Sequence, residues 1–200
     1  MAQVSLKKGE SNKVSLKKAA PALKEFRLEF SWKSGGKLDL DASALVCRRD
    51  STGAPKLTRV DDIVFYGNKV SSDRAVFAGE DQRDGTGEME TIDGTLGKIG
   101  ADKDEVALIL TIDDNTIEKS QTFGQANEGE LRLINAETND VILTFDFLSD
   151  DVKDNNIIHV GSLIREADGW VVVGYGFGFY HKDGILFALL QFGAENSWFK

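Results

Sequence analysis

Residues 25–32 alternate strictly between polar and apolar side chains, in the order Glu-Phe-Arg-Leu-Glu-Phe-Ser-Trp. A β-strand turns successive side chains to opposite faces, so this segment is predicted to be a strand with one buried face. Similar short segments recur between turns rich in Gly, Asn and Asp, at 38–47, 62–66, 75–78, 105–112, 130–135, 141–147, 159–165 and 170–176. This regular succession predicts an all-β fold, a sandwich of two sheets with at most short helical turns.

The two ends of the chain carry further signals. A ten-residue repeat places Val4-Ser5-Leu6-Lys7-Lys8 before Val14-Ser15-Leu16-Lys17-Lys18. Its alternation predicts two short edge strands, and partial disorder of this tail is the alternative. Residues 184–192 are a short apolar run that fits a final strand or a docked helix equally well. The length of 200 residues supplies one ordinary core, so residues 1–200 are expected to form a single domain.

Charge limits the class of partner. The formal net charge is −9, and residues 1–24 hold six lysines against Glu10, which leaves −14 for the rest of the chain. An acidic body disfavours nucleic acid, because phosphate binding needs a concentrated basic face. Cations and basic proteins fit better, and contact between the lysine-rich tail and an anionic membrane surface stays open.

Cysteine count and hydropathy indicate the compartment. Cys47 is the only cysteine, which excludes an internal disulfide and a zinc site built from several cysteines. The basic residues near Met1 are not followed by the apolar stretch of a signal peptide, and no apolar run reaches membrane-spanning length. We therefore expect a cytoplasmic protein without a transmembrane segment.

Three acidic segments stand out. In residues 38–44, strand alternation puts Asp39 and Asp41 on one face and Leu38 and Leu40 on the other. The second segment, 79–90, is a glycine-rich loop with five acids against one arginine, and the third is Asp113-Asp114-Asn115, which follows the apolar segment 106–112.

Calcium prefers roughly six to eight oxygen ligands in an adaptable arrangement, which such segments supply. Two carboxylates about 5 Å apart repel by roughly 3 kcal/mol at an effective dielectric constant of about 20. If the segments converge, they therefore require a cation, raised pKa values or local disorder. A solvated acidic face is the simpler alternative.

Signals for catalysis are weak. His159 and His181 are the only histidines, and neither has the spacing of a metal site or a catalytic triad. The run 174–180 is similar to a dinucleotide-binding loop, but Phe179 stands in place of the third glycine and no βαβ pattern surrounds it. We interpret it as a glycine-aromatic strand, and we do not expect an enzyme.

The order of the motifs is distinctive. They are Val4-Ser5-Leu6, Val14-Ser15-Leu16, Pro21-x-Leu23, Trp32, 38–44, Asp62-x-Val64-Phe65-Tyr66-x-Asn68, Ile112-Asp113-Asp114, Phe123-Gly124-Gln125 and Gly169-Trp170. In this order the chain resembles the TerD-like tellurium-resistance and stress-response family over nearly its whole length. The resemblance implies a β-sandwich that binds calcium, is made under stress, and contributes to resistance to tellurite, oxidants or phage without a known catalytic activity.

The resemblance also implies calcium ligands. Asp39 and Asp41 match the family's D-x-D-A-S strand, and Asp114 matches the acid of its I-H-D motif. The central loop departs from the family's G-D-N-x-T-G and G-D-D-E motifs: it is shorter, and Met89 replaces an acid. Asp113 stands where the family has histidine, which adds a carboxylate back.

These observations combine into one hypothesis and one alternative. The hypothesis is a stress-response module whose bound calcium, one or two ions, orders a surface that partner proteins recognise. Because the loop is altered, we expect one complete and one degraded site. The alternative is an interaction protein of a larger assembly, for example a virion-associated one, that binds calcium weakly or not at all. The predicted metal ligands are Asp39, Asp41, Glu80, Asp81, Glu88, Glu90, Asp113 and Asp114.

Overall fold

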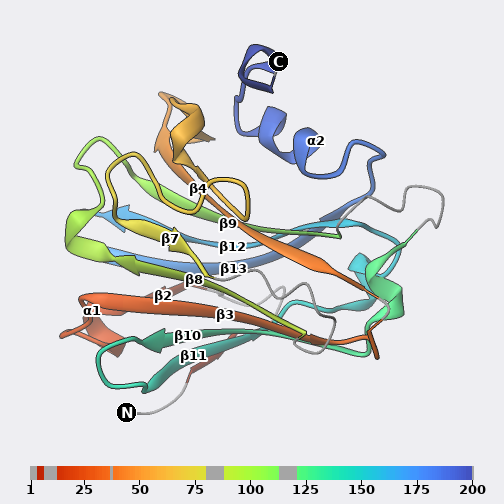
Figure 1. The fold of residues 1–200 in the computed structure, drawn as a ribbon. Coiled ribbons are helices and arrows are strands. Elements are labelled where there is room, and N and C mark those ends of the chain that lie inside the picture. The colour runs from red at the N-terminus through yellow and green to blue at the C-terminus, as the bar shows by residue number, and fades with distance from the viewer. Residues whose placement is uncertain (1–3, 7–12, 37, 80–87, 113–120, 200) are drawn as a thin grey trace.

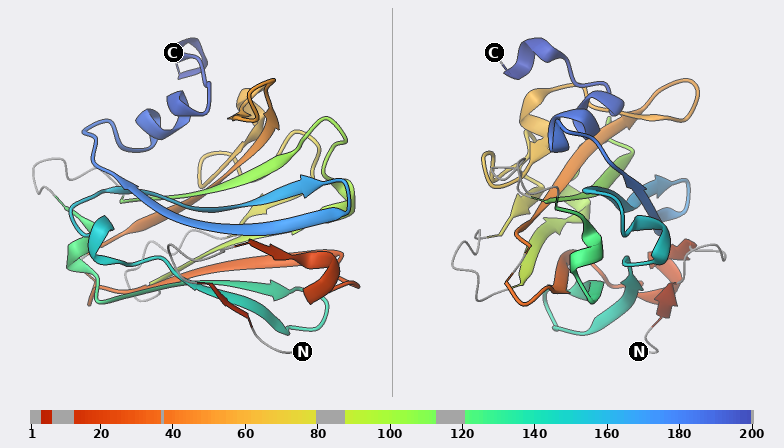
Figure 2. Two further views of the ribbon diagram at one scale, coloured as in Figure 1. Left: turned by 180° about the vertical axis from the view of Figure 1, so that it is seen from behind. Right: turned by 90° about the vertical axis from the view of Figure 1, so that its right-hand side faces the viewer.

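Two β-sheets face each other across a continuous apolar core (Figure 1, Figure 2). The computed structural model describes residues 4–6, 13–36, 38–79, 88–112 and 121–199. This arrangement confirms the predicted sandwich. The six-stranded sheet has the order β1 (Val4–Leu6), β11 (Val141–Asp146), β10 (Glu128–Asn135), β3 (Glu25–Lys33), β8 (Met89–Thr95) and β7 (Val76–Ala78).

The seven-stranded sheet forms the other layer of the sandwich. Its order is β2 (Lys13–Ser15), β13 (Gly169–Phe179), β12 (Ile157–Glu166), β9 (Glu105–Ile112), β4 (Leu40–Arg49) and β5 (Pro55–Lys56), with β6 (Ile63–Val64) paired to β4. Among the described strands, only β1 and β11 pair in parallel. The short helical elements are α1 (Leu16–Ala19), η1 (Val60–Asp62), η2 (Leu96–Lys98), η4 (Phe123–Gln125), η5 (Asp150–Val152), α2 (Gly184–Gln191) and η6 (Asn196–Phe199).

The alternation in β3 becomes burial in the structure. Phe26, Leu28 and Phe30 are fully buried between the sheets, where they join Leu108 and Leu110 of the facing β9. Burial of each such side chain contributes about 1.5–3 kcal/mol. The core between the sheets therefore follows directly from the period-two pattern.

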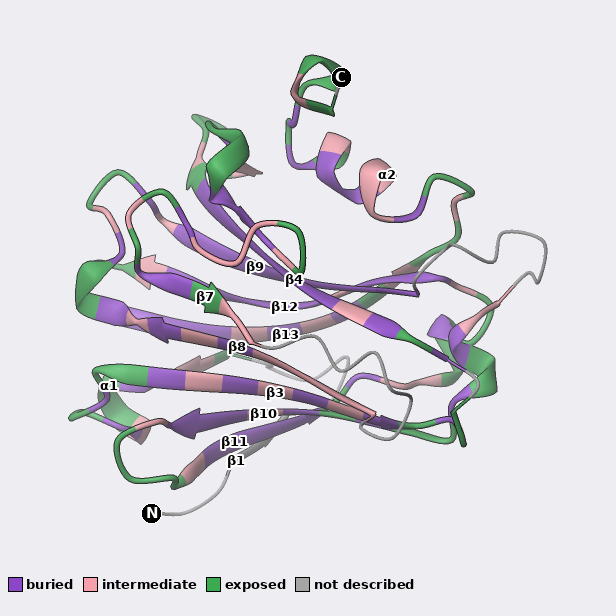
Figure 3. Cartoon of the chain, viewed as in Figure 1, coloured by how far each residue is buried: buried purple, intermediate pink, exposed green. Residues whose placement is uncertain are grey.

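The C-terminal apolar run forms a helix rather than a strand. Helix α2 lies on the outer face of the seven-stranded sheet (Figure 1), where Ala188 and Leu189 join a second apolar cluster with Leu45 and Ile109. The seven-stranded sheet is thus covered on both faces at β9, every residue of which is buried (Figure 3). None of the helices among the described residues is long and apolar enough to cross a membrane.

The two copies of the N-terminal repeat enter different sheets. In the first copy, β1 pairs with β11, and in the second copy, β2 pairs with β13. Each strand is the last one of its sheet. The predicted edge strands are therefore confirmed in part. The second copy is extended only as far as Ser15, since Leu16–Ala19 form α1, and Lys7 and Lys8 lie outside the described residues.

Two strands were not predicted, the two-residue β5 and the longer β8. We assigned Met89 and Glu90 to the acidic loop, but both belong to β8, which pairs with β3 and β7. This assignment was wrong because Ile92 is the only strongly apolar residue in β8 after Met89, so the strand has little hydrophobic pattern of its own. The glycine-aromatic strand is confirmed, since β13 continues to Phe179.

Candidate metal centre

The first acidic segment lies where β4 begins. Leu38 and Leu40 are buried in the core, whereas Asp39 is exposed and Asp41 is half-buried, as the alternation predicts. Asp41 pairs with Thr111, one residue before the end of β9. Because paired residues of neighbouring strands share a face, Asp41 lies beside Thr111 on the outer face of the seven-stranded sheet.

Strand β9 brings the chain to the same place before the third acidic segment. Leu40 pairs with Ile112, the residue that precedes Asp113 in the sequence. The backbone N–H of Ile112 donates to the Asn156 carbonyl (3.1 Å), and the N–H of Phe123 donates to the Asn155 carbonyl (2.9 Å). The described chain on both sides of residues 113–120 is therefore held at one end of the sandwich, on the right in Figure 1.

The flanks of the second segment are held at this end too. The N–H of Gly79 donates to the Thr91 carbonyl (2.8 Å), and the N–H of Trp32 donates to the Glu88 carbonyl (3.0 Å). The Trp32 indole N–H also donates to the Leu38 carbonyl (3.3 Å), just before Asp39. Backbone hydrogen bonds therefore bring the described flanks of all three acidic segments to one end, which we call the acidic end.

The Glu88 carboxylate already has partners in the protein. Its Oε1 accepts hydrogen bonds from the Ser34 N–H (2.6 Å), the Ser34 hydroxyl (2.6 Å) and the Gly36 N–H (3.1 Å). Gly35 and Gly36 adopt left-handed φ values of 67° and 73°, which suit glycine. Burial raises the pKa of Glu88, but the hydrogen bonds from Ser34 and from the backbone outweigh it and lower the pKa.

Glu90 faces a different direction from Asp41. It pairs with Phe30, whose side chain is fully buried between the sheets, so Glu90 lies on the inner face of the six-stranded sheet. It is half-buried at the start of β8. Since β4 packs against β8, the structure places Asp41 and Glu90 on neighbouring strands of different sheets.

The other predicted ligands, Glu80, Asp81, Asp113 and Asp114, lie outside the described residues. Among the residues that the structure does describe, no group of three or more His, Cys, Asp or Glu side chains could hold a metal ion. The described donors at the acidic end are carboxylates, the hard oxygen ligands that calcium prefers. The donor chemistry therefore fits calcium, and the complete ligand set stays a prediction.

Two contributors to this end were not predicted. Ser34 is buried and holds Glu88 in place, and its hydroxyl also accepts a hydrogen bond from the Leu38 N–H (3.0 Å). Asn156 is buried, and its side-chain amide makes two 3.0 Å hydrogen bonds with the backbone of His181. The Ser-Gly-Gly sequence after β3 could have indicated the first, but nothing local distinguishes Asn156.

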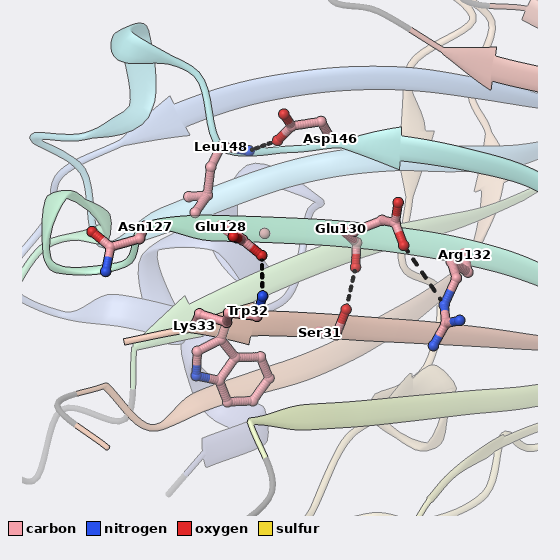
Figure 4. Close-up of a pocket in the computed structure, with 10 residues that line it drawn as sticks. Ser31, Trp32, Lys33, Asn127, Glu128, Glu130, Arg132, Asp146 and Leu148 are labelled. Atoms are coloured by element: carbon pink, nitrogen blue, oxygen red, sulfur yellow. Dashed lines mark hydrogen bonds and ion pairs between the residues drawn. The ribbon is translucent and has the colours of Figure 1, made fainter. Parts of the chain in front are cut away.

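A polar groove of about 500 Å³ lies on the outer face of the six-stranded sheet near the same end (Figure 4). Its carboxylates have partners: Glu128 pairs with Lys33 at 2.5 Å, Glu130 lies 3.7 Å from Arg132, and Asp146 accepts from the Leu148 N–H at 3.0 Å. The groove is therefore not a second cluster of acids that needs a cation.

Comparison with known proteins identifies the family. A profile of the TerD domain matches residues 1–191. The chain belongs to the TerD family. It is 30% identical to the tellurium resistance protein TerD of Serratia marcescens, over 97% of this chain and 99% of that protein. The resemblance seen in the motifs is thereby confirmed.

Further relatives of this TerD chain extend the comparison to stress and to structure. It is 30% identical to general stress protein 16U of Bacillus subtilis, over 88% of this chain and 91% of that protein. A crystal structure described as a homologue of telluride resistance protein, from Streptomyces coelicolor, superposes with a TM-score of 0.66. It is 20% identical and covers 87% of this chain and 100% of that one, so it supports the fold alone.

Proposed function

We propose that this TerD chain is a non-catalytic, cytoplasmic stress-response module that binds calcium at its acidic end and presents the ordered surface to partner proteins. Family membership supplies the stress context. The observation that supports calcium is the set of backbone hydrogen bonds that brings the described flanks of the three acidic segments together.

The physical case rests on charge. The three acidic segments, 38–44, 79–90 and 113–115, hold nine acids against one arginine. Tethering their flanks to one end of the sandwich raises the local negative charge, and a bound cation would relieve the repulsion. Asp39 and Asp41 would hold the ion from the start of β4, together with Asp113, Asp114, Glu80 and Asp81. Glu90 faces the inner side of the other sheet and is not among these ligands.

Calorimetric titration of the metal-free protein with calcium tests the proposal. We expect saturable binding of one or two ions and a loss of binding in the double variant Asp39→Asn/Asp41→Asn. Asp146→Asn is the matched control, because it removes one carboxylate from the polar groove on the other sheet. Heat equal to the buffer blank at millimolar calcium would overturn the proposal.

A second candidate function is an interaction protein of a larger assembly that has little or no calcium binding. The hydrogen bonding of Glu88 favours this function, because Oε1 of this predicted ligand already accepts hydrogen bonds from Ser34 and Gly36. Size-exclusion chromatography with calcium and with chelator separates the two functions. Calcium-independent oligomers would favour the assembly role, and an elution volume that changes with chelator would favour the calcium module.

A further inference from the structure

A separate apolar cavity of about 320 Å³ lies between helix α2 and the outer face of the seven-stranded sheet. Ile109, Ile157 and His159 contribute to it from the sheet, and Phe187 and Phe192 from the helix side. Its volume falls at the lower end of the range of small-molecule sites, about 300–1,000 Å³. The proposed calcium module makes no use of it.

The part of the cavity wall that β9 and β12 form carries no charge at neutral pH. His159 is its one titratable residue, and burial lowers its pKa to about 4. Its ring packs edge-on against Tyr175 and Phe192, with centroids 4.8 and 5.4 Å apart, and Nε2 lies 3.2 Å from the Ser162 hydroxyl. The neutral imidazole is thus part of an aromatic wall.

One end of the cavity is cationic. Lys56 is the only charged side chain among the described residues that line it. The Lys56 ammonium donates to the Gln191 carbonyl (3.3 Å), and the N–H of the next residue, Leu57, donates to the Phe192 carbonyl (2.7 Å). These bonds hold the cation at the C-terminal end of α2, and no acid of the cavity lining neutralises it.

The other end opens onto exposed aromatic side chains. Phe179, which precedes the N-terminal end of α2, lines the cavity and is 45% exposed, and its neighbour on the same face, Phe177, is 53% exposed. Gly178 between them faces inward, where a Cβ would lie 2.5 Å from the Asn155 amide. The glycine-aromatic pattern therefore keeps large apolar rings on the outer surface beside the cavity mouth.

We propose that this cavity binds an aliphatic carboxylate, with the carboxylate at Lys56 and the hydrocarbon chain directed along α2 toward Phe179. The apolar lining excludes water from the hydrocarbon chain, and the single cation of the lining selects an anionic head over a neutral or cationic one. No part of this site overlaps with the predicted calcium ligands.

Titration calorimetry with sodium octanoate in chelator-containing buffer tests the proposal independently of calcium. We expect saturable binding of octanoate, much weaker binding of octan-1-ol, and no binding of octylammonium or acetate. Lys56→Met, which keeps the aliphatic stem, should weaken octanoate at least tenfold, while Lys56→Arg should retain binding. Lys98→Met is the matched control, because Lys98 is an exposed lysine outside the cavity.

Three results would overturn the proposal. They are the absence of saturable octanoate binding, equal binding of octanoate and octylammonium, and unchanged affinity in Lys56→Met. A second copy of the chain is the competing occupant of the exposed aromatic surface. Sedimentation that shows a concentration-dependent dimer unaffected by octanoate would assign the surface to that copy instead.

Discussion

The two ends of the sandwich balance their charges in opposite ways. At the end where β9 begins, the buried acids meet cations of the same chain: Lys103 pairs with Asp62, and Arg49 pairs with Glu105 at 2.8 Å. At the acidic end, the carboxylate of Glu88 is held by backbone N–H groups and by Ser34 instead. One end is held by ion pairs within the chain, and the other brings together the flanks of the three acidic segments, where we propose that calcium binds.

The first end, which we call the ion-paired end, is also cross-linked through backbone groups. The Arg165 guanidinium donates to the carbonyls of Lys103, Ile99 and Gly100 at 2.9–3.1 Å. Asp62 also accepts from the Ser72 hydroxyl at 2.6 Å. Such a network stabilises only while each buried charge keeps its partner.

The largest effect is therefore expected from Lys103→Met. It leaves Asp62, fully buried, without its cation, which should lower the free energy of unfolding by about 3–5 kcal/mol. Urea denaturation measures the loss. Lys98→Met, at an exposed site, should change stability by less than about 0.5 kcal/mol. A loss below about 1 kcal/mol in Lys103→Met would show that the ion-paired end does not depend on this pair.

Calcium is expected to act on the acidic end alone. At 100 times its Kd, an ion that binds only the folded state adds about 2.7 kcal/mol to the free energy of unfolding. Denaturation in calcium and in chelator should show this gain in the wild type and in Asp146→Asn, but not in Asp39→Asn/Asp41→Asn.

Hydrogen exchange then locates the effect. Calcium should slow exchange of the Ile112 and Phe123 N–H groups, which donate to Asn156 and Asn155. The Arg165 N–H, which donates to the Asp104 carbonyl at the ion-paired end, is the internal control for local opening. Slowing confined to Arg165 would contradict the assignment of the metal to the acidic end.

Glu88 gives a smaller, pH-dependent effect. Its pKa is lowered in the folded state, so its contribution to stability is present above the ordinary value of 4.5 and is lost as the pH falls through the folded value. Glu88→Gln weakens charge-assisted hydrogen bonds to residues 34–36 and should cost about 1–2 kcal/mol at neutral pH. Acid titration of stability should be shallower in the variant, and parallel curves would contradict this role.

The fold was predictable where the alternation of polar and apolar residues in a strand matched one buried face of a sheet. The alternation of Phe26, Leu28 and Phe30 defined β3, and the V-S-L repeat indicated the edge strands β1 and β2, although Leu16 of the second copy begins α1. Strand β8 escaped prediction because its pairing with β3 and β7, rather than its own sequence, makes it a strand. The apolar run at 184–192 could not be assigned locally, because only the outer face of the seven-stranded sheet selects the helix.

The candidate site was predictable in composition more than in arrangement. Strand alternation correctly gave the exposed face of Asp39 and Asp41. The inward orientation of Glu90 depends on pairing with Phe30, and the hydrogen bond between Ser34 and Glu88 joins residues 54 positions apart. No local pattern encodes either contact. The same is true of Lys56, whose place at the end of α2 depends on a contact with Gln191.

The smallest effect is expected on the alkylation rate of Cys47. Labelling of this thiol reports on opening of the ion-paired end without any substitution there. The thiol is fully buried beside the Glu105 region, and burial, with the charge of Glu105, raises its pKa well above the ordinary value. Iodoacetamide should therefore leave the native protein unmodified and label it readily in urea. Because opening of this end is required for labelling, Lys103→Met should accelerate it in native buffer, and Lys98→Met should not. Rapid labelling of the wild type would show that the ion-paired end opens as readily as a loop, and would remove the contrast between the two ends.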